Sequence, residues 1–214
     1  MAGRERNPRG EGERLRTTLL DVATELLAEV HDIDKLSVRA VTARAGVSPT
    51  ALYLHFADKA ALIGAVKDRC FTALTAQMTA AVAAEDEDDP QAQLRAVGRA
   101  YLAFAREQPG WYAVMFGTNF RDHFQAEDFE AGANAPMDAF GLLVAAVARC
   151  LDPSAGEQEA FELATILWAV VHGRASLGQA IARFPFPDEE RWLTRIVAAV
   201  IAPASGLPGG RASD

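Results

Sequence analysis

Apolar residues recur at helical spacing along most of the chain, and no stretch alternates as a half-buried strand does. The first set predicts a long amphipathic helix over 12–31, with its apolar face formed by Leu15, Leu19, Val22, Leu26 and Val30. Eight further helices are predicted: two short ones within 37–56, one from Lys59 through Met78, one around 94–104 ending near Pro109, and four over 111–116, 137–151, 157–182 and 189–201. The pattern indicates an all-α fold of about nine helices.

Two short helices joined by a tight turn are predicted within residues 37–56. Ser37 is a good N-cap for the first helix, and Gly46 ends it, because glycine adopts the left-handed C-cap conformation without steric cost. Ser48 is then an N-cap for the second helix, and Pro49 fits its first position, where a missing N–H costs nothing. The segment therefore predicts a helix-turn-helix.

The second helix has a narrow apolar face, formed by Leu52 and Phe56, which leaves its other side chains free to reach a DNA groove. Tyr53, His55 and Lys59 are expected to contact phosphates, whereas base contacts would be small or apolar, because no Arg, Asn or Gln lies on this helix. A helical hairpin packed in a core is the alternative. The candidate DNA-binding residues are Arg39, Ser48, Pro49, Thr50, Ala51, Tyr53, Leu54, His55 and Lys59.

The order AGVSPTALYLHFADK, residues 45–59, resembles the recognition-helix signature of the tetracycline-repressor (TetR) family of bacterial transcriptional regulators. The resemblance is strong over residues 12–70. Thr42, where the family usually has alanine, and Ala60-Ala61, where it usually has an acidic pair, depart from the pattern. The matching positions are Ala45, Gly46, Val47, Ser48, Leu52, Tyr53, His55, Phe56 and Lys59.

The resemblance implies a three-helix DNA-binding domain joined by a long helix to a larger helical domain for ligand binding and dimerisation. We place the DNA-binding domain at 12–58 and the regulatory domain at 59–202. Residues 203–214, rich in Gly, Pro, Ser and Ala, are expected to form a disordered tail. Residues 1–11 are expected to form a flexible basic arm that contacts phosphates or a minor groove, or else a solubilising tail.

A net charge of −8 would disfavour DNA binding if it were spread evenly, but it is not evenly divided along the chain. Residues 1–60 hold nine basic and nine acidic side chains, against twelve and twenty in the remainder. The DNA-binding end is therefore neutral rather than repulsive. Five of its cations come early in the chain, namely Arg4, Arg6, Arg9, Arg14 and Arg16.

Aromatic residues gather around an irregular segment, 117–135, that could gate a cavity. They line a pocket or form a packed core, and the family resemblance favours a pocket for a small, hydrophobic or aromatic effector. His172 is either a hydrogen-bond donor to that effector or a satisfied core histidine. The candidate pocket residues are Trp111, Tyr112, Met115, Phe116, Phe140, Trp168 and His172.

A homodimer built from the last two helices is also implied by the resemblance, and Gly173 within a helix suggests close helix packing. Two-fold symmetry would match a palindromic operator. The candidate interface residues are Ala169, Gly173, Leu177, Trp192, Ile196 and Val200.

Enzymatic activity is not expected, because the chain has no GxSxG, HExxH or P-loop motif. The best catalytic group, Asp122, His123, Glu127 and Asp128, lacks a nucleophile. No cofactor or metal is expected, and the acidic run 85–90 is interpreted as a solvated loop. Cys70 and Cys150 are interpreted as thiols of a reducing compartment, with a redox role as the less favoured alternative. Without a signal or membrane segment, the protein is expected to be cytoplasmic.

The sequence thus predicts a ligand-responsive DNA-binding transcriptional regulator. Its most favoured form is a homodimeric repressor that a small effector releases from a palindromic operator in double-stranded DNA. The alternatives are a helical adaptor that binds a protein without a DNA function, and a transcriptional activator of the same fold.

Overall fold

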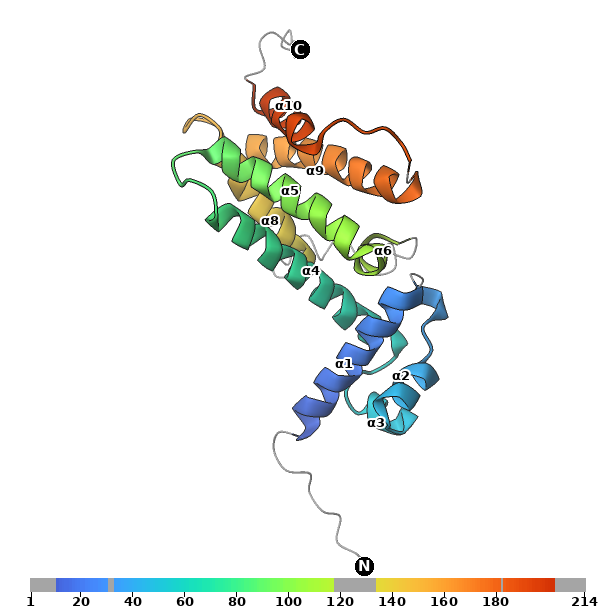
Figure 1. Ribbon diagram of the computed structural model, residues 1–214. Coiled ribbons are helices and arrows are strands. Elements are labelled where there is room, and N and C mark those ends of the chain that lie inside the picture. Colours follow the sequence, from blue (N-terminus) through green and yellow to red (C-terminus); the bar gives the residue numbers. More distant parts are fainter. Residues whose placement is uncertain (1–10, 31–32, 118–133, 182, 203–214) are drawn as a thin grey trace, which may run out of the picture. The chain divides into compact units, whose positions relative to one another are not determined.

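The computed structural model describes residues 11–30, 33–117, 134–181 and 183–202, and every regular element in these ranges is a helix (Figure 1). The prediction of an all-α fold is therefore confirmed. The helices are α1 (Glu11–Val30), the 3-10 helix η1 (Ile33–Lys35), α2 (Val38–Ala45), α3 (Pro49–Tyr53), α4 (Lys59–Ala83), α5 (Pro90–Glu107), α6 (Pro109–Phe116), α8 (Ala135–Ala148), α9 (Glu157–Ala180) and α10 (Glu189–Ile201).

Several helix bounds differ from the sequence-based expectation by a few residues. The helix predicted to reach residue 56 ends at Tyr53, because the amides of His55 and Phe56 both donate to the Leu52 carbonyl and close a turn. The loop expected after α1 contains the short helix η1. Helix α4 includes the predicted segment from Lys59 through Met78 and ends at Ala83, just before the acidic run 85–90.

The chain folds into two compact units, which we call the first and second units. Met1–Ala76 and Phe104–Ala139 make up the first, and Gln77–Ala103 and Phe140–Asp214 make up the second. This division does not follow the predicted boundary at residue 59, because the first part of α4 and all of α6 belong to the same unit as α1. The functional boundary at residue 59 stays a prediction.

In the first unit, α1 is the central helix and packs against α2 and α6. Its fully buried positions are Leu19, Ala23 and Leu27, whereas Val30, predicted to lie on the buried face, is exposed. Gly110 of α6 approaches α1 so closely that a Cβ atom built on it would lie 2.4 Å from the Ala28 carbonyl oxygen. Only glycine fits this crossing without a shift of one helix.

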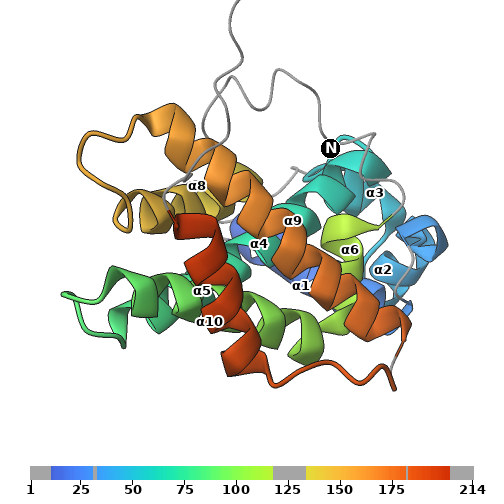
Figure 2. The ribbon, with the colours of Figure 1, turned by 90° about the horizontal axis from the view of Figure 1, so that it is seen from above.

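In the second unit, α10 packs against α9 and α5, as Figure 2 shows. Leu193 of α10 is fully buried and reaches Gly98 of α5, where its Cδ2 atom would lie 2.7 Å from an added Cβ. Helix α8 joins this unit through Phe140, whose ring meets those of Phe161 and Trp168 on α9. These contacts join α5, α8, α9 and α10 within the second unit.

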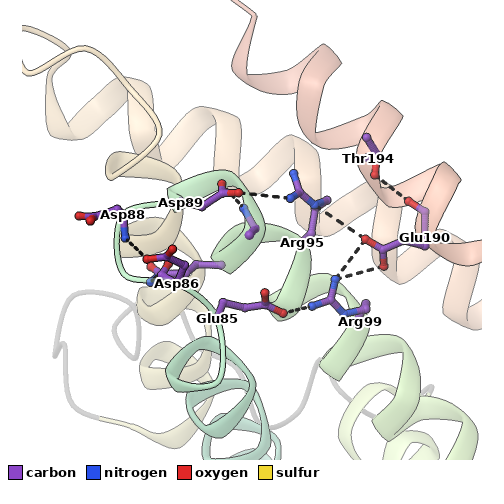
Figure 3. A network of polar contacts seen from close by, with 10 residues as sticks. Glu85, Asp86, Asp88, Asp89, Arg95, Arg99, Glu190 and Thr194 are labelled. Carbon is purple, nitrogen blue, oxygen red and sulfur yellow. Dashed lines mark hydrogen bonds and ion pairs between the residues drawn. The ribbon is translucent and has the colours of Figure 1, made fainter.

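The acidic run 85–90 is more than the solvated loop that we predicted, because two of its carboxylates pair with arginines of α5 (Figure 3). Glu85 pairs with Arg99, and Asp89 lies 3.8 Å from Arg95. Both arginines also contact Glu190 of α10, at 3.1 Å from Arg99 and 3.8 Å from Arg95. The run therefore has a structural role in holding the α4–α5 connection and α10 on α5.

Candidate nucleic-acid interface

The turn between α2 and α3 has the geometry that its residue types predict. The Ser37 hydroxyl oxygen accepts a hydrogen bond from the Ala40 amide at 3.0 Å and caps α2. Gly46 has φ +70° and ψ 28°, the left-handed conformation, and the Val47 amide donates to the Thr42 carbonyl at 3.0 Å. The Thr42 side chain is buried, and its hydroxyl donates to the Val38 carbonyl, so this departure from the family pattern leaves no unpaired polar group.

Helix α3 is anchored by one side and exposed on the others. Leu52 is fully buried and Phe56 is 3% exposed, as predicted. The Ser48 hydroxyl oxygen caps the helix by accepting from the Ala51 amide at 3.3 Å, and Pro49 occupies the first turn. Among the predicted DNA-binding residues, Arg39, Ser48, Pro49, Thr50, Tyr53 and Leu54 are exposed, and Ala51, His55 and Lys59 are half-buried.

Ion pairs join α1 to α2 and to α4. Arg44 of α2 lies 3.0 Å from Glu29 of α1, and Arg69 of α4 pairs with Asp21 of α1. Such half-exposed pairs contribute little stability each, about 0–1 kcal/mol. The α1–α2 contact holds the helix-turn-helix on its scaffold.

Two basic side chains of this region have intramolecular roles that the sequence did not predict. Arg16, counted with the basic residues near the N-terminus, lies on α1, and its guanidinium stacks over the Phe56 ring at 5.1 Å. Lys59 donates from Nζ to the Asp34 carbonyl at 3.2 Å and so connects η1 to the start of α4. Arg16 and Phe56 are 40 positions apart, so no pattern in the sequence predicts their contact. Arg4, Arg6 and Arg9 lie outside the described residues.

The predicted pocket residues divide between the two units. Trp111, Tyr112, Met115 and Phe116 all lie on α6 in the first unit, whereas Phe140, Trp168 and His172 belong to the second. Within α6, the rings of Tyr112 and Phe116 are 4.9 Å apart, and Phe116 also meets Phe71 of α4 edge-on. Tyr112 and Met115 are buried, which fits the packed-core alternative for these two side chains.

The second unit contains a connected row of rings that runs from α8 across α9 to α5. Phe140 lies 5.9 Å from Trp168, which lies 5.9 Å from His172, whose ring is 6.4 Å from Tyr101. Trp168 is 37% exposed. The sequence gives no signal that Tyr101 belongs to this row, because its hydrogen-bond partner His172 is 71 positions away.

His172 has a hydrogen-bond partner at each ring nitrogen. The Tyr101 hydroxyl lies 2.9 Å from Nδ1, and the Ser176 hydroxyl lies 3.4 Å from Nε2. Burial lowers the pKa of His172 from its ordinary value of 6.5, so the ring is neutral at pH 7. These contacts fit the expected satisfied histidine, and they leave its role toward an effector a prediction.

The predicted interface residues occupy α9 and α10. Ala169 and Leu177 are exposed, and the other four, Gly173, Trp192, Ile196 and Val200, are half-buried. Trp192 has a partner within the chain, because the Arg174 guanidinium stacks over its ring at 4.6 Å and over the Phe186 ring at 4.9 Å. The interface itself stays a prediction.

Several other predicted groups have no role at a site within the described structure. Asp122, His123, Glu127 and Asp128 lie outside the described residues, as does the irregular segment from 118 to 133. Burial raises the pKa of Cys70 to about 12 and also raises that of Cys150, so both free thiols stay protonated at pH 7.

No three His, Cys, Asp or Glu side chains in the described ranges are placed to hold a metal ion. None of the described helices has the length and apolar character that a membrane span requires.

Family models match both ends of this architecture. The model of bacterial regulatory proteins of the tetR family matches residues 19–66, which include the helix-turn-helix. The model of the tetracyclin repressor-like C-terminal domain matches residues 94–200, half of the chain. The chain belongs to the TetR family. This TetR-family protein is accordingly a transcriptional regulator with an N-terminal DNA-binding domain and a helical C-terminal domain.

Solved structures resemble this TetR-family protein over nearly its whole length. A protein of unknown function from Rhodococcus sp. RHA1 is 27% identical, with a TM-score of 0.70 over 92% of this chain and 97% of that one. A tetR-family transcriptional regulator from Streptomyces coelicolor is 21% identical, with a TM-score of 0.64 over 88% and 79% of the two chains. The second likeness supports the fold alone.

A curated relative, the nucleoid occlusion factor SlmA of Photobacterium profundum, is 29% identical to this TetR-family protein over 121 residues. The match covers 55% of this chain and 56% of that protein, so the chain spans little more than half the length of this relative.

Proposed function

We propose that this TetR-family protein is a homodimeric repressor that binds a palindromic operator and leaves it when a small, largely apolar effector binds. The observation that carries the DNA-binding part is the division of α3 into a buried anchor and an exposed surface. Leu52 is fully buried, whereas Tyr53 and Leu54 are 51% and 79% exposed. Capping at Ser48 and the turn at Gly46 hold these exposed side chains in fixed positions.

Selection from random duplex DNA with the full-length protein tests this proposal. We expect a palindromic site, because a two-fold symmetric dimer presents two copies of α3. Failure to enrich any palindrome would refute the operator and the dimeric docking together. On the recovered duplex, Tyr53→Ala and Lys59→Gln should each weaken binding, and Lys59→Gln, which removes a cation, should also lower the salt slope by about 1. Thr79→Ala, an exposed change on α4 outside the helix-turn-helix, is the matched control and should leave affinity unchanged.

An effector site in the second unit is supported by the row Phe140, Trp168 and His172. Aromatic faces with few polar groups suit an apolar ligand, and the half-exposed Trp168 provides a fluorescent reporter. The dye 1-anilinonaphthalene-8-sulfonate, whose aromatic rings bind apolar surfaces, is a suitable probe. We expect its binding to weaken in Phe140→Ala and Trp168→Ala, and we expect the dye to lower operator affinity. Unchanged dye binding in both variants would contradict this placement of the site.

The homodimer is supported by apolar side chains along α9 and at its C-cap residue, Ile181, that the described part of the chain leaves exposed. Ile166 is 51%, Leu177 is 50% and Ile181 is 48% exposed, and Ala169 and Gly173 lie between them at helical spacing. A second copy of the same helix would bury this surface. We expect Leu177→Asp to be monomeric by sedimentation. Loss of DNA binding in the same sample would support the link between the dimer and operator binding.

The proposal assigns the chain no enzymatic activity. Repression is tested by placing the selected site in a promoter: expression should fall when the protein is present and recover when Tyr53→Ala replaces it. A rise in expression instead would favour an activator of the same fold.

A further inference from the structure

Leu54 is the most exposed of the large hydrophobic side chains in the described part of the chain, at 79%. It occupies the C-cap of α3 with helical backbone angles, φ −72° and ψ −18°. The Leu52 carbonyl accepts from the amides of both His55 and Phe56, at 2.9 and 3.0 Å, and Leu52 and Phe56 are buried on either side. The backbone at Leu54 is therefore fixed, and its exposure follows from the fold rather than from a loose loop.

The exposed neighbours of Leu54 offer few hydrogen bonds to base edges. The Ser48 hydroxyl oxygen accepts from the Ala51 amide to cap α3 and keeps one O–H donor, Pro49 has no donor, and Thr50 and Tyr53 each carry one hydroxyl group. No amide or guanidinium side chain lies on α3, so the bidentate contacts that identify guanine or adenine are unavailable to this helix. Apolar contact must therefore supply a large share of any base discrimination by α3.

The major groove offers one apolar group, the 5-methyl group of thymine. We propose that Leu54 reads this methyl group, so that each half-site of the operator contains an A·T pair whose thymine faces Leu54. The inference rests on the proposed DNA-binding function and adds the chemical group that is recognised. A leucine at this position discriminates thymine from cytosine, because cytosine presents a polar amino group and lacks the methyl.

Duplex DNA is favoured over a protein partner as the occupant of this surface. Leu54 follows Tyr53 and lies one helical turn from Thr50 on the exposed side of a helix-turn-helix, and Tyr53 and Leu54 are the only large hydrophobic side chains exposed within residues 37–59. A protein-docking surface would require several contiguous apolar side chains. A single exposed leucine among polar side chains instead suits the major groove of DNA, where thymine methyl groups lie among polar base edges.

The experiment removes the methyl group without changing the base pairing. The probe is the duplex recovered by random selection with the full-length protein. Each thymine is replaced in turn by deoxyuridine in both half-sites, and the dissociation constant is measured by fluorescence anisotropy. One thymine per half-site should show weaker binding by about fourfold per methyl, or about fifteenfold for the symmetric pair, the effect expected for one buried methyl-sized group.

Two variants make the assignment specific to Leu54. In Leu54→Ala the ratio of the two dissociation constants, deoxyuridine over thymine, should fall to about 1 at that position. Tyr53→Phe, the matched control, removes a phosphate donor but keeps Leu54, so it should weaken both duplexes equally and preserve the ratio. A further duplex with 5-methylcytosine paired to guanine at that position should recover part of the lost affinity relative to unmethylated cytosine. Circular dichroism should confirm that both exposed substitutions leave the fold intact.

The failures can be told apart. If selection recovers a site but no thymine shows a methyl effect that depends on Leu54, this inference is wrong and the proposed function stands. If deoxyuridine weakened the binding of Leu54→Ala as much as that of the natural protein, another residue would contact the methyl group. The inference would then also be wrong. If selection recovers no site, both proposals fail. If Leu54→Ala bound every duplex with the same affinity as the natural protein, Leu54 would make no contact with the DNA and the inference would be wrong.

Discussion

The crossing of α1 and α6 predicts that Gly110→Ala destabilises the first unit, although alanine normally favours a helix over glycine. A Cβ atom at this position would lie 2.4 Å from the Ala28 carbonyl oxygen, 2.6 Å from its Cα and 2.8 Å from its carbonyl carbon. All three are backbone atoms of a helix, so they cannot move aside as a flexible side chain does. One of the two helices must shift.

The expected magnitude follows from two opposing effects. Overpacking by one methyl group in a close contact costs about 1–3 kcal/mol. The higher helix propensity of alanine returns at most about 1 kcal/mol. We therefore expect Gly110→Ala to lower the free energy of unfolding by about 1–2 kcal/mol.

Gly64→Ala is the matched control, because Gly64 also lies in a helix of the first unit and a Cβ atom there would meet nothing within 4 Å. This change should raise stability by about 0.5–1 kcal/mol. The two variants have the same chemistry and should differ by about 2 kcal/mol, with opposite signs relative to the natural protein.

Urea denaturation followed by tryptophan fluorescence measures both changes. The chain has three tryptophans, and only Trp111 lies in the first unit, so a Trp168→Phe, Trp192→Phe background makes the signal report that unit. With a slope of about 1–3 kcal/mol per molar urea, the two midpoints should differ by about 1 M. If Gly110→Ala proved as stable as Gly64→Ala, α6 would not rest on the α1 backbone in solution.

Three further predictions follow from the described geometry. Gly46→Ala should lower the free energy of unfolding by about 1–2 kcal/mol, since φ is +70° there, and Gly46→Asn should cost less in the same chemical denaturation series. Burial lowers the pKa of His172, so the unfolded chain binds this proton first, and the free energy of unfolding should fall as the pH drops below about 6.5. The free energy of unfolding, measured by urea denaturation, should fall less between pH 7.5 and pH 5.5 in His172→Gln than in the natural protein. An equal fall in both proteins would contradict this prediction. Gly173→Ala meets no atom within 4 Å inside the chain, so any loss of dimer in sedimentation must come from a second copy. Gly178→Ala, equally open on the same helix but about 140° around it, should leave the dimer intact.

Local signals in the sequence were sufficient to predict the helix-turn-helix. Ser37, Gly46, Ser48 and Pro49 each act within a few residues of their own position, so their roles as caps and turn residues can be inferred without knowing the rest of the fold. The end of α3 was harder, because His55 and Phe56 both use the Leu52 carbonyl and close a turn within an apparently continuous helical pattern.

Contacts between distant residues were not predictable from periodicity. Spacing identifies the side of a helix that is buried but not the helix that covers it. The predicted pocket residues therefore separated into a group on α6 and the row Phe140, Trp168 and His172. The Arg99–Glu190 pair spans 91 positions, and Tyr101 and His172 span 71. A charge run such as 85–90 looks the same in the sequence whether water or arginine surrounds it.

The single buried position within α3 has a consequence for how such a regulator changes during evolution. Leu52 alone ties this five-residue helix to the core, while Pro49, Thr50, Tyr53 and Leu54 face outward. Substitutions at the outward positions are nearly neutral for folding, since exposed changes without special backbone roles usually stay within about 0.5 kcal/mol. Duplicated genes can therefore diverge in the operators they bind without first acquiring stabilising mutations, and an engineered change of operator can be sought at these positions alone.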